Sequence, residues 1–354
     1  MDHFGILKRA FKIIWRYRAL WVFGVLLALT SGNGNGGNGL RYVLNGDSRP
    51  GGGGMLPFKG NWPFGNGFQW PDWRLGSMET GTLIAIIVGA VIVLLLLAVI
   101  GTAIRYVAEN ALIKMVDRTE TTGASGSVGE GFRWGWSRPA WRMFLADLVV
   151  GLPFFFAVLA LLAIGLSPLL LLLVKTTGAR VLAIVLTVGL MLLVLAVLIF
   201  AGVIIGVLLH LVHRELALAG KGVLEAIASA WDLLRRNNKD VGLVWLLMLG
   251  VGIGWGLVMI VVVLAFLVVG GLLSAGPGLA LYGLTKSVIA GLAVGIPLFL
   301  LTVVAPLVFI SGLYHAFVSS VWTLTYRELK AKEGAPIAPA DAPPAELAAP
   351  PLVA

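Results

Sequence analysis

Long apolar stretches alternate with short polar segments along this chain. Residues 82–104 contain no charged side chain and include the block VIVLLLL at residues 91–97. At about 1.5 Å per residue, a helix of this length crosses about 30 Å of hydrocarbon. Four further stretches reach this length, at residues 144–174, 181–212, 241–273 and 287–322. The pattern predicts five membrane-spanning helices, and the last is long enough to require a kink or an extension beyond the bilayer.

A shorter apolar segment precedes them, at residues 19–30. It covers only about 18 Å, so a complete crossing needs the preceding Ile13, Ile14 and Trp15 and requires Arg16 and Arg18 to reach back to the headgroups. A cleaved signal peptide is the alternative, because a charged start followed by a short apolar core is typical of one. No convincing small-residue cleavage site follows. We therefore expect a retained first span, for about six transmembrane helices.

Composition agrees with an all-α integral membrane protein. The chain is 59% hydrophobic and 12% charged, with a mean hydropathy of +0.96, whereas soluble domains average about 25% charged residues. In a bilayer the backbone polar groups must be satisfied internally, which leaves helices or closed barrels. The apolar stretches are far longer than barrel strands of about 9–11 residues.

The chain has a net charge of +9, and the places of its basic residues predict an orientation. The basic residues lie between spans and are not gathered into one domain, so we expect the bilayer, and not nucleic acid, as the partner. Most fall in segments that the positive-inside rule places in the cytoplasm, at residues 1–18, 105–142, 213–240 and 327–354. The other side receives Arg41, Arg49, Lys59, Arg74, Lys175, Arg180 and Lys286. Both termini are then cytoplasmic in a bacterial plasma (inner) membrane.

The segments that enter the membrane share a helical pattern. Phe4, Leu7, Phe11 and Ile14 have the same spacing as Leu224, Ile227, Trp231 and Leu234, and each set forms one helical stripe. Residues 117–120, 213–216 and 326–329 each place an arginine just beyond a span. The sequence thus predicts three helical hairpins, each preceded by an interfacial amphipathic helix.

This prediction divides the chain into three parts. Residues 1–18 form a cytoplasmic amphipathic helix, residues 19–326 a six-span membrane domain, and residues 327–354 a disordered Ala/Pro-rich cytoplasmic tail. Residues 31–79 form an extracytoplasmic loop rich in Gly, Asn and Trp. Its tryptophans are typical of an interfacial anchor, and a docking loop for a partner protein or a glycan is the alternative.

Candidate chemistry is sparse. The absence of cysteine excludes disulfides, thiolate metal sites and cysteine nucleophiles. Asp147 lies one turn inside a span, where we interpret it as an interfacial group near Arg138 and Arg142. His210 and His213 end another span, and we expect a boundary role for them and not a zinc site, because further ligands at that depth are not evident. We expect no catalytic residue, no bound metal and no cofactor.

One polar stripe stands out on the last span. Ser311, Tyr314, His315 and Ser319 recur at helical spacing, and Trp322 and Tyr326 continue the row. Such a stripe either lines a cavity or supplies hydrogen bonds between helices. The spans also contain pairs of glycines four residues apart, a spacing that permits close helix approach. The pairs are Gly202 and Gly206, Gly250 and Gly254, Gly252 and Gly256, and Gly291 and Gly295.

One cytoplasmic boundary carries a family resemblance. The runs LALAGKGVLEA at residues 216–226 and SAWDLLRRN at residues 229–237 resemble a group of poorly characterised bacterial multi-pass membrane proteins. These include the membrane domain attached to some glycerophosphodiester phosphodiesterases. The resemblance covers spans and cytoplasmic loops and implies no activity, because the chain has no segment like the soluble catalytic barrel.

The sequence favours a non-enzymatic scaffold or accessory subunit that assembles with itself or with another membrane protein. Glycine pairs, amphipathic helices and spans almost empty of charge support this hypothesis. The alternative is a transporter or channel for a neutral or lipidic small molecule, which would use the stripe that contains Tyr314 and His315.

Overall fold

The computed structural model describes residues 1–30, 80–124, 126–173 and 176–334, and these residues form helices joined by short turns. The predictions for the loop at residues 31–79 and for the end of the tail lie outside the described residues. The helices are α1 (His3–Arg16), α2 (Ala19–Thr30), α4 (Thr80–Thr122), α5 (Val128–Gly135), α6 (Arg138–Leu166), α7 (Thr177–Leu218), α8 (Val223–Arg236), α9 (Asn238–Thr285), α10 (Val288–Phe299) and α11 (Ala305–Lys332). The described part is thus all-helical, as the sequence predicts.

Five helical segments are long and apolar enough to cross a membrane. They are Ile87–Thr122, Arg138–Leu171, Thr177–Leu218, Asn238–Thr285 and Val288–Lys332. A sixth exists if α1 and α2 are counted as one span, but these two helices meet at an angle of 102°. The chain is a multi-pass membrane protein with five to six spans, and the first predicted span is a sharply bent helix pair.

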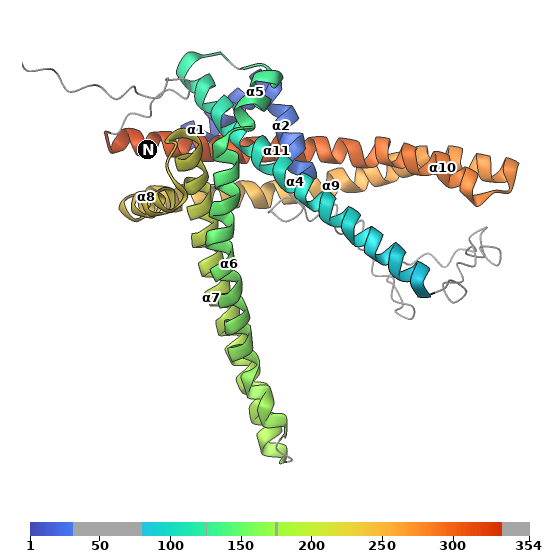
Figure 1. Ribbon diagram of the computed structural model, residues 1–354, viewed down its shortest axis with the longest axis horizontal. Helices are drawn as coiled ribbons and strands as arrows, with labels where there is room; N and C mark the ends of the chain where they lie inside the picture. Colours follow the sequence, from blue (N-terminus) through green and yellow to red (C-terminus); the bar gives the residue numbers. More distant parts are fainter. Residues whose placement is uncertain (31–79, 125, 174–175, 335–354) are drawn as a thin grey trace, which may run out of the picture.

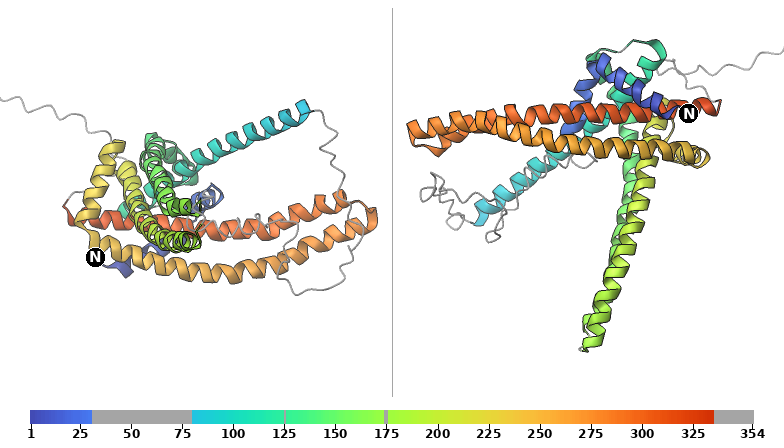
Figure 2. Two further views of the ribbon diagram at one scale, coloured as in Figure 1. Left: turned by 90° about the horizontal axis from the view of Figure 1, so that it is seen from below. Right: turned by 180° about the vertical axis from the view of Figure 1, so that it is seen from behind.

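The long helices radiate as arms from a compact region, which we call the hub (Figures 1 and 2). The hub comprises α1, α2, α5, α8 and the adjoining ends of α4, α6, α7, α9 and α11. One arm is α4, the second is α6 lying beside α7, and the third is α9 lying beside α10 and α11. At about 1.5 Å per residue, α7 with 42 residues extends about 63 Å. The arms therefore exceed the hydrocarbon thickness of a bilayer.

The hub contains the main hydrophobic core. Its largest fully buried apolar side chains include Ile6, Phe23, Leu112, Met143 and Leu211, which come from five different helices. On the arms, by contrast, large apolar side chains such as those of residues 91–97 are exposed. Exposed apolar arms are what a lipid environment requires, whereas the core of the hub is buried by the protein itself.

Two helices continue beyond the predicted spans. The span predicted to end at residue 104 continues as α4 to Thr122, and the span predicted to end at residue 212 continues as α7 to Leu218. The predicted loop at residues 105–142 is therefore mostly helical. The physical reason is that the polar side chains of these extensions find partners within the hub, so the helices need not end where the apolar pattern ends.

Prolines mark the irregular turns of the arms. Pro153 lies inside α6. Pro168 lies in a 3-10 helix, Ser167–Leu173, which follows α6 directly. Pro297 and Pro306 flank a π-helical turn, Leu300–Val304, between α10 and α11. The irregular turn arises here because proline removes a backbone donor and clashes with the preceding turn.

A reciprocal cap fixes the start of α5. The Ser127 hydroxyl oxygen accepts a hydrogen bond from the backbone N–H of Glu130 at 3.2 Å, and the Glu130 carboxylate accepts one from the backbone N–H of Ser127 at 2.7 Å. The pair is a capping box, which satisfies two donors at the helix start. The hydrogen bond from the Ser127 backbone lowers the pKa of Glu130.

The amphipathic helices face the hub with only part of the predicted stripes. α1 buries Ile6, Ala10, Ile13 and Ile14, while Phe4 and Phe11 of the predicted stripe are exposed. α8 buries Ala226, Ala230 and Leu233, while Leu224 and Trp231 are exposed. Of the remaining stripe residues, Ile14 is buried, and Leu7, Ile227 and Leu234 pack against the core. The buried faces are thus rotated from the predicted stripes but share part of them.

Candidate functional site

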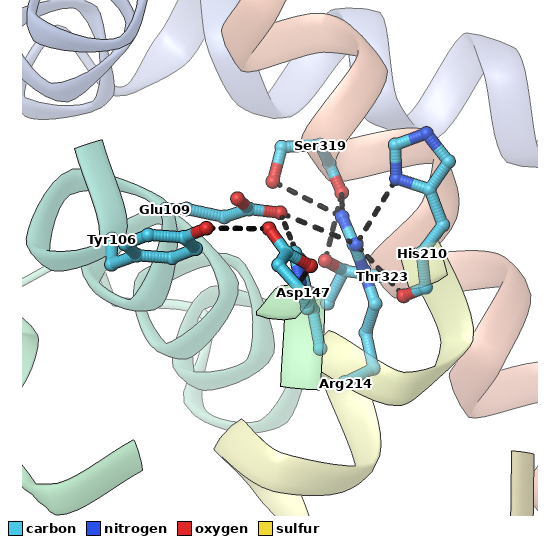
Figure 3. Close-up of polar contacts among 8 residues, drawn as sticks. Tyr106, Glu109, Asp147, His210, Arg214, Ser319 and Thr323 are labelled. Carbon is cyan, nitrogen blue, oxygen red and sulfur yellow. Dashed lines mark hydrogen bonds and ion pairs between the residues drawn. The ribbon is translucent and has the colours of Figure 1, made fainter. Parts of the chain in front are cut away.

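Four helices bring polar side chains into one buried cluster at the hub (Figure 3). α4 supplies Tyr106 and Glu109, and α6 supplies Asp147. The remaining members are His210, His213 and Arg214 on α7, and Ser319 and Thr323 on α11. Helices of all three arms meet here: α4, α6 and α7 supply the charged side chains, and α11 supplies two hydroxyl groups. We call these eight residues the polar cluster.

His213 is the centre of the polar cluster. Its Nδ1 lies 2.8 Å from Glu109 Oε1, and its Nε2 lies 2.8 Å from Asp147 Oδ1. The residue is 5% exposed. Because both ring nitrogens can donate only in the imidazolium form, the geometry favours a charged ring held between two carboxylates. The ring thereby joins α4 and α6 to α7.

Arg214 supplies the second positive charge and is completely buried. One of its terminal nitrogens donates to the backbone oxygen of His210 at 2.8 Å, and the other donates to the backbone oxygen of Ser319 at 3.1 Å. The guanidinium also lies 3.8 Å from Glu109. Two carboxylates thus face a guanidinium and an imidazole, and the charges balance when His213 is protonated. Such balance is what a buried ionic group needs to offset its loss of hydration.

Neutral side chains complete the polar cluster. The Tyr106 hydroxyl donates to Asp147 Oδ2 at 2.6 Å, and the Thr323 hydroxyl donates to the backbone oxygen of Ser319 at 2.8 Å. The His210 ring stacks on Trp322, with ring centres 5.0 Å apart. The described partners of the carboxylates are therefore protein groups on neighbouring helices.

The predicted environment of Asp147 differs from the observed one. The sequence suggested Arg138 and Arg142 as its neighbours, but its hydrogen bonds are to Tyr106 and His213. Arg142 instead donates to the backbone oxygens of Gly220 and Lys221. An acid one turn inside a span is thus anchored by side chains from two other spans.

A second buried group lies one residue further along α7. Glu215 Oε1 accepts hydrogen bonds from Lys330 Nζ at 2.7 Å and from the Ser229 hydroxyl at 2.9 Å, and Glu215 Oε2 lies 3.0 Å from Lys221 Nζ. The carboxylate side chain is completely buried. It connects α7 to α8 and α11, so consecutive residues of α7 tie together different parts of the hub.

We expect Glu215→Gln to lower the free energy of unfolding by about 1–2 kcal/mol, because an amide replaces the carboxylate shared by two lysines. Thermal unfolding of the full chain in mild detergent measures the change. Glu225→Gln is the matched control, since Glu225 is exposed on α8. Equal stability of the two variants would contradict a structural role for Glu215.

Two of the three span exits that share a sequence pattern, residues 117–120 and 326–329, meet in the hub. Asp117 pairs with Arg327, and the Glu120 and Glu328 carboxylates both pair with Arg9. Charged residues that follow separate spans thus serve as partners for each other and for α1.

The predicted stripe on the last span contacts two different helices. Tyr314 stacks on Trp255 of α9, with ring centres 4.9 Å apart and planes 8° from parallel. Ser319 receives Arg214 of α7. Ser311 and His315 are half-buried, and the His315 ring lies edge-on to Tyr314. The structure therefore divides the stripe between the second and third arms.

A cavity lies elsewhere, between α8 and the end of α11. Its volume is about 280 Å³. Its lining residues are Glu225, Ala228, Ser229, Asp232, Leu233, Arg236, Lys330 and Glu333. None of them belongs to the predicted stripe or to the polar cluster. Within the described ranges, no group of three or more His, Cys, Asp or Glu side chains is arranged to hold a metal ion.

Sequence reasoning did not identify Tyr106 and Glu109 as members of a site. The available signal was the acid Glu109, which follows the uncharged stretch at residues 82–104 closely. Its partner His213 is 104 residues away in the chain, and helical spacing carries no information about such a distance.

Comparisons with known proteins identify a family but no characterised relative. No curated protein and no solved structure matches the chain. The model of a family of unknown function, DUF7544, matches residues 15–327, which is most of the chain, and the protein therefore belongs to the DUF7544 family.

Proposed function

We propose that this protein is a non-enzymatic membrane scaffold or accessory subunit whose arms assemble with a second copy or with another membrane protein. The observation that carries the proposal is the uneven use of glycine along the spans. Some glycines bring two helices of the chain together, whereas others of the same spacing contact nothing in the described part of the protein.

Glycines are used inside the chain at two helix crossings. A Cβ added at Gly24 of α2 would lie 2.3 Å from the backbone oxygen of Gly312 of α11. A Cβ added at Gly291 of α10 would lie 2.8 Å from the backbone oxygen of Gly278 of α9. Close backbone approach at small residues is a principal means of helix association in lipid. The fold thus relies on this kind of contact.

Two other glycine pairs have no neighbouring helix beside them in the described part of the protein. Within 4 Å of a Cβ added at Gly202 or Gly206 of α7, or at Gly250 or Gly254 of α9, the described chain has no atom beyond the helix itself. These pairs lie on the exposed arms, where they offer the same close approach to a helix from another molecule. We therefore infer that the arms are assembly surfaces, and that the hub fixes their directions.

The polar cluster supports a structural role over a catalytic one. Its carboxylates are bonded to His213 and Tyr106, and its guanidinium to backbone oxygens. The transport alternative gains no support, because Tyr314 and Ser319 contact helices and do not line the cavity between α8 and α11.

The proposal includes the finer architecture that the sequence predicts. α1, α5 and α8 precede α2, α6 and α9 in the chain, which agrees with three hairpins that each follow an interfacial helix. A cytoplasmic hub and cytoplasmic termini follow from the distribution of lysine and arginine, and a bacterial inner membrane is what the resemblance to bacterial membrane proteins implies. The resemblance of residues 216–237 to the membrane domain of some glycerophosphodiester phosphodiesterases stays a prediction from the sequence.

Native mass spectrometry of the full chain, in mild detergent and in lipid nanodiscs, tests this function. We expect an oligomer or a stoichiometric complex with a membrane protein, and we expect Gly250→Leu/Gly254→Leu to dissociate it. The matched control is Gly89→Leu/Gly101→Leu on α4, which also replaces two open glycines but without four-residue spacing. A parent protein that is monomeric and without partner in both media would exclude the proposal.

A further inference from the structure

α1 presents a row of exposed aromatic side chains on the side opposite to the hub. Phe4, Phe11 and Trp15 are 74%, 62% and 66% exposed. The three residues follow one another at i, i+7 and i+11, so they lie along one line of the helix. The Phe11 and Trp15 rings are stacked, with centres 6.0 Å apart. A row of this kind is costly in water and favourable in the headgroup region of a bilayer.

A basic row runs beside these aromatic side chains. Lys8, Lys12 and Arg16 are exposed and recur every four residues. In the described part of the protein, Lys8 and Lys12 form no ion pair. Arg9, on the flank that turns toward the hub, pairs with Glu120 and Glu328. This pairing and the buried Ile6 and Ala10 fix the rotation of α1, so the two lysines remain on the outer surface.

The bend after α1 gives this surface its direction. α1 and α2 meet at 102°, so α1 lies nearly at right angles to the apolar helix that follows it. An interfacial amphipathic helix takes this direction when the helix that follows it enters the bilayer.

The aromatic row is also continuous with an arm. The Trp15 ring lies 6.3 Å from Trp21 of α2, and the Trp21 ring lies 5.7 Å from Phe309 of α11. Phe309 is exposed on a segment long and apolar enough to span the membrane. The outer face of α1 therefore continues into a surface that contacts lipid, and does not turn away from it.

We propose that α1 is a binding site for anionic phospholipids. Phe4, Phe11 and Trp15 enter the headgroup region, while Lys8 and Lys12 bind the phosphate groups of the same leaflet. Basic residues at a membrane surface attract anionic lipids with about 1 kcal/mol each, which is about a fivefold change in affinity. The charge on this face matches a negatively charged leaflet, and its aromatic row suits the interface better than an aqueous protein contact.

A fluorescent reporter on the full chain tests this site. Since the protein has no cysteine, Phe4→Cys supplies a single position for an environment-sensitive label. The labelled protein in mild detergent is titrated with phosphatidylglycerol and, separately, with phosphatidylcholine. We expect a blue shift of the label at lower concentrations of phosphatidylglycerol, and we expect Lys8→Gln/Lys12→Gln to weaken this response about thirtyfold.

The control removes two positive charges from another place. Arg180→Gln/Lys286→Gln alters the exposed basic residues near the far ends of the second and third arms, and it should leave the response unchanged. Equal responses to the two lipids, or equal loss in the two double variants, would overturn the proposal. A blue shift that grows with protein concentration without lipid would also overturn it, because it would identify the surface as a contact between copies.

Discussion

His213→Leu is expected to lower the free energy of unfolding by about 3–5 kcal/mol, the largest effect that we predict for a single replacement. Leucine is close to histidine in volume, so no large cavity forms. The loss arises because Glu109 and Asp147 each lose a partner at 2.8 Å. Arg214, at 3.8 Å from Glu109, compensates only one of the two carboxylates. Chemical or thermal unfolding of the full chain in mild detergent measures the difference.

Two further variants separate this cause from a general effect of losing a histidine. His315→Leu makes the same replacement on α11, where the half-buried ring contacts Tyr314, and it should cost less than about 1 kcal/mol. Adding Asp147→Asn to His213→Leu removes the carboxylate that Arg214 does not compensate and should restore part of the lost stability, while Glu109 stays as the partner of Arg214. If His213→Leu were as stable as His315→Leu, the polar cluster would not hold the arms together.

The spans were predictable because their physics is local. An uncharged stretch such as residues 82–104 must avoid water wherever it lies, and a run of that length can satisfy its backbone groups in lipid only as a helix. The π-helical turn between Pro297 and Pro306 is local in the same sense, since proline perturbs the turn that precedes it. Neither conclusion requires knowledge of any other part of the chain.

The polar cluster was not predictable, because its chemistry arises from contacts between distant segments. His213 and Arg214 read as boundary residues by themselves, and Asp147 reads as an acid near its own basic neighbours. The structure places Glu109 and Tyr106 beside them, although these residues precede His213 by about a hundred positions. Which ends of the long helices meet is decided by packing in the hub, and periodicity does not encode it.

α1 shows an intermediate case. Its sequence predicts an amphipathic helix, and the helix is present. The apolar residues, however, cover more than half of its circumference, so the pattern alone does not tell which part is buried. The structure assigns Ile6, Ala10 and Ile13 to the hub and Phe4 and Phe11 to the outside. This division follows from the close packing that small and branched side chains allow, and it leaves the aromatic row for the bilayer.

Gly312→Val is expected to separate α2 from α11 and to lower the free energy of unfolding by about 3 kcal/mol, the upper end of the range for overpacking. A Cβ at Gly312 would lie 2.7 Å from the Val25 Cα atom and 2.7 Å from the Val25 backbone nitrogen. Side-chain rotation cannot relieve a clash with backbone atoms, so the two helices must move apart. Gly89→Val on α4 is the control, because nothing lies within 4 Å of a Cβ at that position.

A single cysteine reports the separation directly. Phe23 of α2 is completely buried, so the cysteine of Phe23→Cys should resist a thiol reagent in the parent protein and in Gly89→Val but react in Gly312→Val. This result would show that α2 is held by its crossing with α11, as a retained helix requires. A cysteine at position 23 that reacts equally in all three proteins would mean that α2 does not pack on α11, whereas a mature chain that lacks position 23 would support the signal-peptide alternative for residues 19–30.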